Sequence, residues 1–167
     1  MGKIYVIGLG PSSIDSLTLG AVQRINSGDA NFLRTEKHPT VEYFKENKIP
    51  YKSFDYLYEA EEEFENVYKK IVDELIRESK DKDINYFVPG NPMVAEKTVE
   101  LLIEKGLDIE IISGMSFIEP IIELVGRDPI NGLKLVDGAE FSSLVIDINC
   151  DLLITQVYNT RILSEIK

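Results

Sequence analysis

Two glycine-containing turns, each directly after an apolar segment, are the parts of the chain best suited to hold a ligand. The first reads Gly-Leu-Gly-Pro at residues 8–11, and the second reads Pro-Gly-Asn-Pro at residues 89–92. Glycine lets a backbone approach a ligand closely and adopt conformations that other residues avoid. Pro92 favours a helix that begins there, with free N–H groups in its first turn. If both apolar segments are parallel strands, the two turns line one crevice at their carboxyl ends.

Strands and helices are expected to alternate along residues 1–114. Apolar runs predict strands at residues 3–7, 31–34, 51–54, 85–88 and 108–112. Helices are expected at residues 18–25, from Pro39 onward, at 61–79 and at 93–105. The helix at 61–79 has the clearest pattern, with apolar residues spaced i, i+3, i+4 and i+7. This alternation predicts an α/β fold with a mainly parallel five-stranded sheet and helices on both faces.

The remaining residues, 115–167, contain fewer elements. Their pattern predicts a helix at 115–125, strands at 133–137 and 152–158, and a helix that begins at Arg161. Two strands and two helices are too few for an independent core. We therefore expect a domain at residues 1–114 and the start of a second, incomplete α/β lobe at 115–167, in a chain truncated relative to its parent protein.

Charge and hydrophobicity exclude several partners. The net charge of −11 repels nucleic acid phosphates. The longest apolar runs are about five residues, against the roughly 20 that a membrane helix needs. With a single cysteine, Cys150, an internal disulfide is excluded. We expect a cytoplasmic protein without signal peptide, nucleic acid partner or membrane contact.

Several chemical interpretations of single residues remain open. The turn at 8–11 partly fits a dinucleotide fingerprint, but Ser13 occupies the position of the third glycine, so a plain structural turn is an alternative to NAD or FAD binding. His38 has no nucleophile at a spacing that supports a general base. Ser116 could cap a helix or direct its hydroxyl and N–H into the crevice. No group of His, Asp and Glu has the spacing of metal ligands.

Four motifs, in this order and spacing, resemble the tetrapyrrole (corrin/porphyrin) methylases. They lie at residues 6–11, 17–19, 88–92 and 114–117. Within that family the chain is most similar to the methylase-like domain fused ahead of MazG-type nucleotide pyrophosphohydrolases. That similarity rests on residues 35–39, 53–58, 128–132 and 155–158. The resemblance covers essentially the whole chain.

The resemblance implies an S-adenosylmethionine-dependent methyltransferase whose cofactor lies between two α/β domains. The residues it assigns to cofactor binding are Leu9, Gly10, Pro11, Gly90, Asn91, Val94, Ser116, Phe117, Thr155 and Gln156. The family pattern has an acid or histidine where Asn91 stands, a glycine at Ser12 and a serine at Phe117. No catalytic residue and no metal are assigned.

The same resemblance implies partners. They are a small-molecule acceptor, for which a tetrapyrrole is one candidate, a second copy of the chain in a homodimer, and a MazG-type domain downstream in the parent chain. An alternative interpretation is a module that binds S-adenosylmethionine, or only acts as a scaffold, for an attached pyrophosphohydrolase domain. A methylase needs an acceptor site beside the sulfonium, whereas a scaffold does not.

Overall fold

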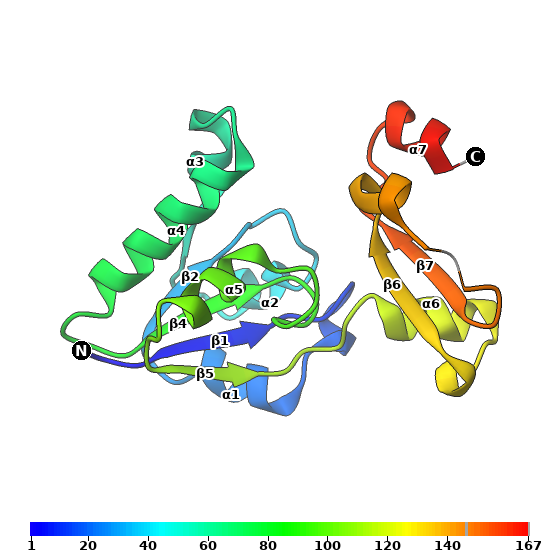
Figure 1. Cartoon of the computed structure of the whole chain (residues 1–167). Helices are drawn as coiled ribbons and strands as arrows, with labels where there is room; N and C mark the ends of the chain where they lie inside the picture. The colour runs from blue at the N-terminus through cyan, green and yellow to red at the C-terminus, as the bar shows by residue number, and fades with distance from the viewer. Residues whose placement is uncertain (146, 167) are drawn as a thin grey trace. The chain divides into compact units, whose positions relative to one another are not determined.

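The protein is described by a computed structural model that places residues 1–145 and 147–166. It divides into two compact units, Met1–Glu119 and Pro120–Lys167, which are described separately (Figure 1). The described helices include none that is both long enough and apolar enough to cross a bilayer.

The first unit contains a five-stranded sheet in the order β3-β2-β4-β1-β5. The strands are β1 (Ile4–Gly8), β2 (Ala30–Leu33), β3 (Lys52–Ser53), β4 (Ile84–Val88) and β5 (Ile109–Ile112). Every neighbouring pair is parallel, and Ile4 of β1 lies opposite Ile84 on one side and Ile109 on the other. The predicted parallel five-stranded sheet is therefore confirmed.

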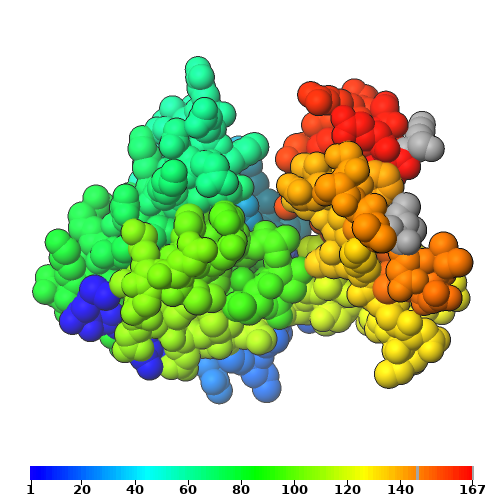
Figure 2. All heavy atoms as spheres, in the orientation of Figure 1, coloured from blue at the N-terminus to red at the C-terminus, as the bar shows by residue number. Residues whose placement is uncertain are grey.

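Five helices of this unit cover both faces of the sheet. They are α1 (Leu19–Ile25), α2 (Val41–Glu46), α3 (Asp55–Ala60), α4 (Phe64–Glu78) and α5 (Lys97–Glu104). Figure 1 shows α4 and α5 on one side of the sheet and α1 on the other. In the space-filling view, atoms of later segments hide almost all of the dark blue strand β1 (Figure 2). A sheet covered on both faces explains why its strands are nearly continuous apolar runs.

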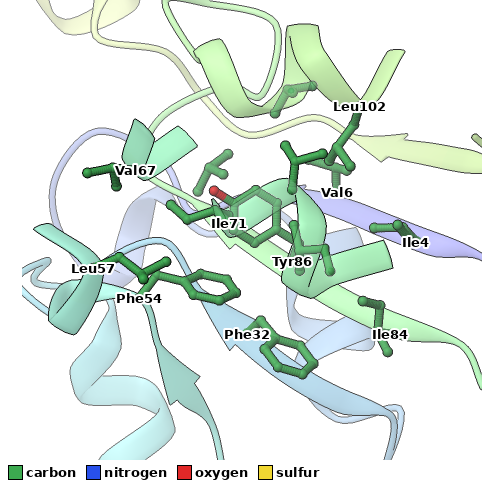
Figure 3. Packing of buried hydrophobic residues seen from close by; sticks show 14 residues of the cluster. Ile4, Val6, Phe32, Phe54, Leu57, Val67, Ile71, Ile84, Tyr86 and Leu102 are labelled. Atoms are coloured by element: carbon green, nitrogen blue, oxygen red, sulfur yellow. The ribbon is translucent and has the colours of Figure 1, made fainter. Parts of the chain in front are cut away.

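Alternating strand residues supply two separate hydrophobic clusters. Val6 and Tyr86 belong to the cluster under α4 and α5, and Figure 3 shows the Tyr86 ring near its centre. Ile7 and Phe87, the next residues along β1 and β4, belong to the cluster under α1 and α2. This alternation follows from the two-residue period of a strand.

The described residues of the second unit contain a two-stranded parallel sheet and four 3₁₀ or α-helical segments. Its strands are β6 (Leu133–Asp137) and β7 (Asp151–Thr155). Its helices are α6 (Ile118–Val125), which begins in the first unit, and α7 (Thr160–Ile166). Two 3₁₀ turns lie at Pro129–Asn131 and Gly138–Ser143. The observed strand β6 has the same bounds as the strand predicted at residues 133–137. The strand predicted to reach Tyr158 ends at Thr155, because Gln156 adopts a φ of +61°. Lys167, the end of the predicted last helix, lies outside the described residues.

The long helix predicted at 61–79 is wrong at its start. Glu61 and Glu63 have extended backbone, the helix begins at Phe64, and a separate helix, α3, precedes the break. On one continuous helix, Glu62 and Glu63 would lie three and four residues after Glu59. Like charges at that spacing destabilise a helix, which accounts for the interruption.

Two other predicted helices begin later than expected. The segment after Pro92 forms a series of turns and becomes helical only at Lys97, and the helix predicted from Met115 begins at Ile118. The helix expected from Pro39 likewise begins at Val41. In the first two cases, side-chain hydrogen bonds hold the residues before the helix in other conformations.

Candidate functional site

The carboxyl ends of β1 and β4 are joined by their glycines. Gly90 N donates a hydrogen bond to Gly10 O at 2.8 Å, and Gly10 N donates to Gly90 O at 3.2 Å. Both glycines have positive φ, +77° for Gly10 and +69° for Gly90, a conformation that other residues adopt only with strain. The Gly90 N–H is thus already bonded and is not the free donor that a helix start at this turn would offer.

A third backbone, the loop after β5, approaches this pair just as closely. A methyl group added at Gly8 would lie 2.4 Å from Gly90 O and 2.5 Å from Gly114 N. One added at Gly114 would lie 2.4 Å from Gly90 O. Only glycine fits at either position, so three strand ends meet backbone to backbone. We call Gly8, Gly10, Gly90 and Gly114 the glycine edge.

Asn91 connects the loop after β4 to the loop after β5. Its Nδ2 donates to Gly114 O at 2.9 Å, and its Oδ1 accepts from Met93 N at 2.9 Å. The second bond closes a turn of the kind that asparagine makes with backbone two residues later, and this turn competes with helix formation. It is one reason why no helix begins at Pro92.

A buried ion pair fixes the far end of the same loop. Glu96, with 2% of its side chain exposed, accepts from Arg34 Nη1 at 2.7 Å and from the Thr98 hydroxyl at 2.5 Å. Arg34 also donates from Nε to the Tyr58 hydroxyl at 3.0 Å. Burial alone would lower the pKa of Arg34, but the Glu96 carboxylate and Tyr58 raise it, so the guanidinium remains charged. Ala95, just before Glu96, has a φ of +55°, which marks local strain.

Ser116 acts as a helix cap. Its hydroxyl accepts from Ile118 N at 3.0 Å, and the Glu119 carboxylate accepts from both the hydroxyl and the N–H of Ser116. This is the reciprocal arrangement of a capping box. Burial would raise the pKa of Glu119, but the bonds from Ser116 hold it below the usual value. Of the two interpretations open for Ser116, the structure shows the cap.

Eight of the ten residues expected at the site lie on these three loops: Leu9, Gly10, Pro11, Gly90, Asn91, Val94, Ser116 and Phe117. The side chain of Leu9 is buried in the cluster under α1 and α2, and its N–H donates to Val88 O. Thr155 and Gln156 belong to the second unit. There Thr155 ends β7, and its hydroxyl donates to Val136 O at 3.2 Å.

The segments that follow β2 and β3 hold further polar residues at the same edge of the sheet. Asp55 accepts from the Thr35 hydroxyl at 2.6 Å, from Glu36 N at 2.7 Å and from the Ser53 hydroxyl at 2.8 Å. Burial would raise the pKa of Asp55, but these bonds outweigh burial and lower it. His38 Nδ1 lies 2.7 Å from the Thr40 hydroxyl, and burial lowers the pKa of the imidazole. Thr40, the hydrogen-bond partner of His38, is fully buried.

The sequence placed Gly8 and Gly114 in candidate ligand loops, but it did not predict their close packing or the role of Arg34. Nothing local distinguishes Arg34 from a solvated arginine. Among the described residues, no three His, Cys, Asp or Glu side chains form a group that could hold a metal ion.

A cavity of about 630 Å³ lies elsewhere, at the amino ends of β2 and β3. Asn31, Lys52 and Lys82 are among its lining residues. Asn31 Nδ2 donates to Pro50 O, and Lys52 is paired with Glu74. Ligands of open parallel sheets bind at the carboxyl ends of the strands. The glycine edge is therefore the better candidate.

Known proteins resemble the chain in sequence and in fold. The family model "Tetrapyrrole (Corrin/Porphyrin) Methylases" matches residues 3–136. The uncharacterized protein YabN of Bacillus subtilis (strain 168) is 36% identical over 170 residues, which cover 99% of this chain and 35% of YabN. The chain thus spans about a third of the length of this curated relative.

Three solved structures share the fold. Uroporphyrin-III-C-methyltransferase from Thermus thermophilus has a TM-score of 0.62 at 17% identity, covering 92% of this chain and 67% of its own. The putative cobalamin synthesis related protein CobF from Corynebacterium diphtheriae has a TM-score of 0.66 at 18% identity, and the match covers 98% of this chain and 76% of CobF. A diphthine synthase has a TM-score of 0.67 at 17% identity, and the match covers 95% of this chain and 66% of the synthase. With the family model matching most of its length, the chain belongs to the tetrapyrrole (corrin/porphyrin) methylase family.

Proposed function

We propose that this chain binds S-adenosylmethionine at the glycine edge and contributes to methyl transfer. The observation that carries the proposal is the meeting of Gly8, Gly90 and Gly114, where a single methyl group would collide with backbone on a neighbouring loop. Members of this family use S-adenosylmethionine as methyl donor. The close packing at this edge brings three loops that follow parallel strands to one place, and the carboxyl ends of such strands are where ligands of open α/β sheets bind.

Within the first unit, the proposed contacts come from three loops. Gly10 and Pro11 follow β1, Gly90 and Asn91 with nearby Val94 follow β4, and Ser116 with Phe117 follows β5. Leu9 would contribute through its backbone alone, because its side chain is buried in the core. The donors of Ser116 are bonded to Glu119, so a ligand at this position has to compete with that carboxylate.

Thr155 and Gln156 are the contacts proposed from the second unit. Gln156 has a φ of +61°, which turns the chain directly after β7. Such a turn presents backbone and side chain at a strand end, as the three glycine-edge loops do in the first unit.

The bound cofactor supplies an electrophilic methyl group on a positively charged sulfur. The chain's own task is to hold the reactants in line and exclude water, and positioning of this kind can contribute roughly 7–11 kcal/mol. The net charge of −11 is compatible with a cationic ligand. The rigid loops at the glycine edge supply the positioning through backbone contacts.

The acceptor is proposed to be a small molecule, with a tetrapyrrole as one candidate. The solved structures of this fold carry different names, among them a uroporphyrin-III methyltransferase and a diphthine synthase, so the fold alone does not select an acceptor. A homodimer, a MazG-type domain downstream in the parent chain and a cytoplasmic location are further proposals, and they rest on the resemblance described above.

Isothermal titration calorimetry with S-adenosylmethionine, S-adenosylhomocysteine and NAD tests the proposal. We expect the first two ligands to bind to this chain and NAD to give no heat of binding. A parallel titration of a longer chain containing it would measure what further residues add. Binding of NAD alone would instead favour a dinucleotide site, and the absence of binding for all three ligands to both chains would refute the proposal.

A further inference from the structure

The hydroxyl of Thr18 makes two hydrogen bonds that connect α1 to the loop after β5. Thr18 is the N-cap residue of α1, and its Oγ1 accepts from Ala21 N at 3.2 Å. The same oxygen donates its own proton to Ser113 O, also at 3.2 Å. The first bond is ordinary helix capping. The second reaches 95 residues along the chain and has no role in the helix.

The loop after β5 is held at two successive carbonyl groups by two different segments. Thr18 donates to Ser113 O, and Asn91 Nδ2 donates to Gly114 O at 2.9 Å. Two residues further, Ser116 is fixed by Glu119. The path of this loop is therefore determined by side chains from α1 and from the loop after β4, in addition to its own sequence.

The packing of α1 explains how Thr18 reaches this loop. Gly20 lies in the first turn of α1, where a methyl group would be 3.2 Å from Ile112 Cγ2 at the end of β5. Glycine is a poor helix former, so its presence in the first turn needs a packing reason. The absence of a side chain lets the start of α1 lie directly against the end of β5, next to Ser113.

We propose that Thr18 is a positioning residue for the cofactor, acting through the loop of residues 113–117. This inference rests on the proposed function. The Thr18 hydroxyl does not need to touch the ligand. Its bond to Ser113 O sets the orientation of the peptide groups at the glycine edge, and so the direction in which Ser116 and Phe117 present their backbones.

Three substitutions separate this role from helix capping. Thr18→Ser keeps both the acceptor and the donor. Thr18→Asp keeps an effective N-cap acceptor, with a charge that suits a helix N-terminus, but a carboxylate cannot donate to Ser113 O. Thr18→Val loses both functions. We expect thermal unfolding midpoints close to wild type for the Ser and Asp variants and a lower midpoint for Val.

Affinity for S-adenosylhomocysteine, measured by calorimetry, should depend on whether residue 18 can donate a hydrogen bond to Ser113 O, and not on whether it caps α1. The Asp and Val variants should bind roughly three- to tenfold more weakly than wild type, the range expected for one lost hydrogen bond, and Thr18→Ser should restore binding. If Thr18 served only as a cap, Thr18→Asp would bind like wild type and Val alone would be weakened. That pattern would overturn the inference.

Amide hydrogen exchange of residues 113–117 gives a readout that needs no ligand. Exchange there should be faster in Thr18→Asp than in Thr18→Ser, while the first turn of α1 stays equally protected in both. Equal exchange in this loop would overturn the inference independently of binding. If the loop responds as expected but wild type binds neither S-adenosylmethionine nor S-adenosylhomocysteine, Thr18 still positions the loop and the proposed ligand is wrong.

Discussion

The close approach at the glycine edge makes Gly114→Ala the most informative substitution. Its new methyl group would lie 2.4 Å from Gly90 O and 2.7 Å from Gly8 C, and contacts under 3.0 Å are essentially never seen. Both atoms are backbone in neighbouring segments, so no side chain can rotate away. The loop after β5 would have to move by roughly 0.6 Å, at a cost typical of overpacking, about 1–3 kcal/mol.

That free energy translates into a measurable loss of stability. We expect the thermal unfolding midpoint, followed by circular dichroism, to fall by roughly 2–12 °C. Small displacements in a binding site reduce the effect of aligned contacts strongly, so S-adenosylhomocysteine should bind roughly tenfold or more weakly in calorimetry. Both effects have the same cause, the displacement of one loop.

Gly28→Ala provides the matched control. Gly28 has a φ of +85° and no atom within 4 Å of the added methyl group, and it precedes β2, at the other edge of the sheet. The substitution should cost about 1–2 kcal/mol through backbone strain alone and leave the affinity for S-adenosylhomocysteine unchanged. If Gly114→Ala retained wild-type stability, the close packing of the three strand ends would be refuted. If it lost stability but bound the ligand like wild type, the glycine edge would not be the site.

Three further outcomes test individual side chains. Glu96→Gln should lower the free energy of unfolding in urea by about 1–3 kcal/mol, because it removes the buried charge that pairs with the partly buried Arg34; an unchanged value would show that the pair is not needed. The depressed pKa of Asp55 means that its contribution to stability is complete above its usual pKa of 3.8 and is lost as pH falls through the lower folded value. Acid unfolding should therefore be less steep for Asp55→Asn, and identical curves would contradict this. Glu119→Ala should lower stability by about 1 kcal/mol and strengthen S-adenosylhomocysteine binding by freeing Ser116; an unaltered affinity would remove Ser116 from the site.

The strands of the sheet could be predicted because the pattern that identifies each one lies within a few consecutive residues. Each strand of the first unit is a short apolar run, such as Ile84–Val88, and parallel strands covered on both faces need little more than that pattern. The predicted bounds differ from the observed ones by one or two residues. The same local reading located the strand at Leu133–Asp137 in the second unit.

The late helix start at Lys97 depends partly on a contact between distant residues. Pro92 is well suited to a first helical position, yet Glu96 pairs with Arg34, 62 residues earlier, and Ala95 has a positive φ, so the segment from Pro92 to Glu96 is not helical. Two other breaks have local signals: Ser116 bonds to Glu119 three residues later, and a run of glutamates precedes Phe64. Reading that run as a solvated helix start overlooked its internal repulsion.

The glycine edge depends on strand order, which the sequence pattern does not determine. Gly8 and Gly114 approach Gly90 only because β1 lies between β4 and β5, so that three strand ends far apart in sequence become neighbours. This arrangement also explains why a search for catalytic side chains found so few candidates. Glycines bring no functional side chains to this edge, and the side chains around it, Thr18, Asn91 and Glu119, bond to the backbone of those loops. The chemistry of such an edge lies in the placement of backbone groups, so substitutions that move the loops should affect binding more than substitutions that remove a single charge.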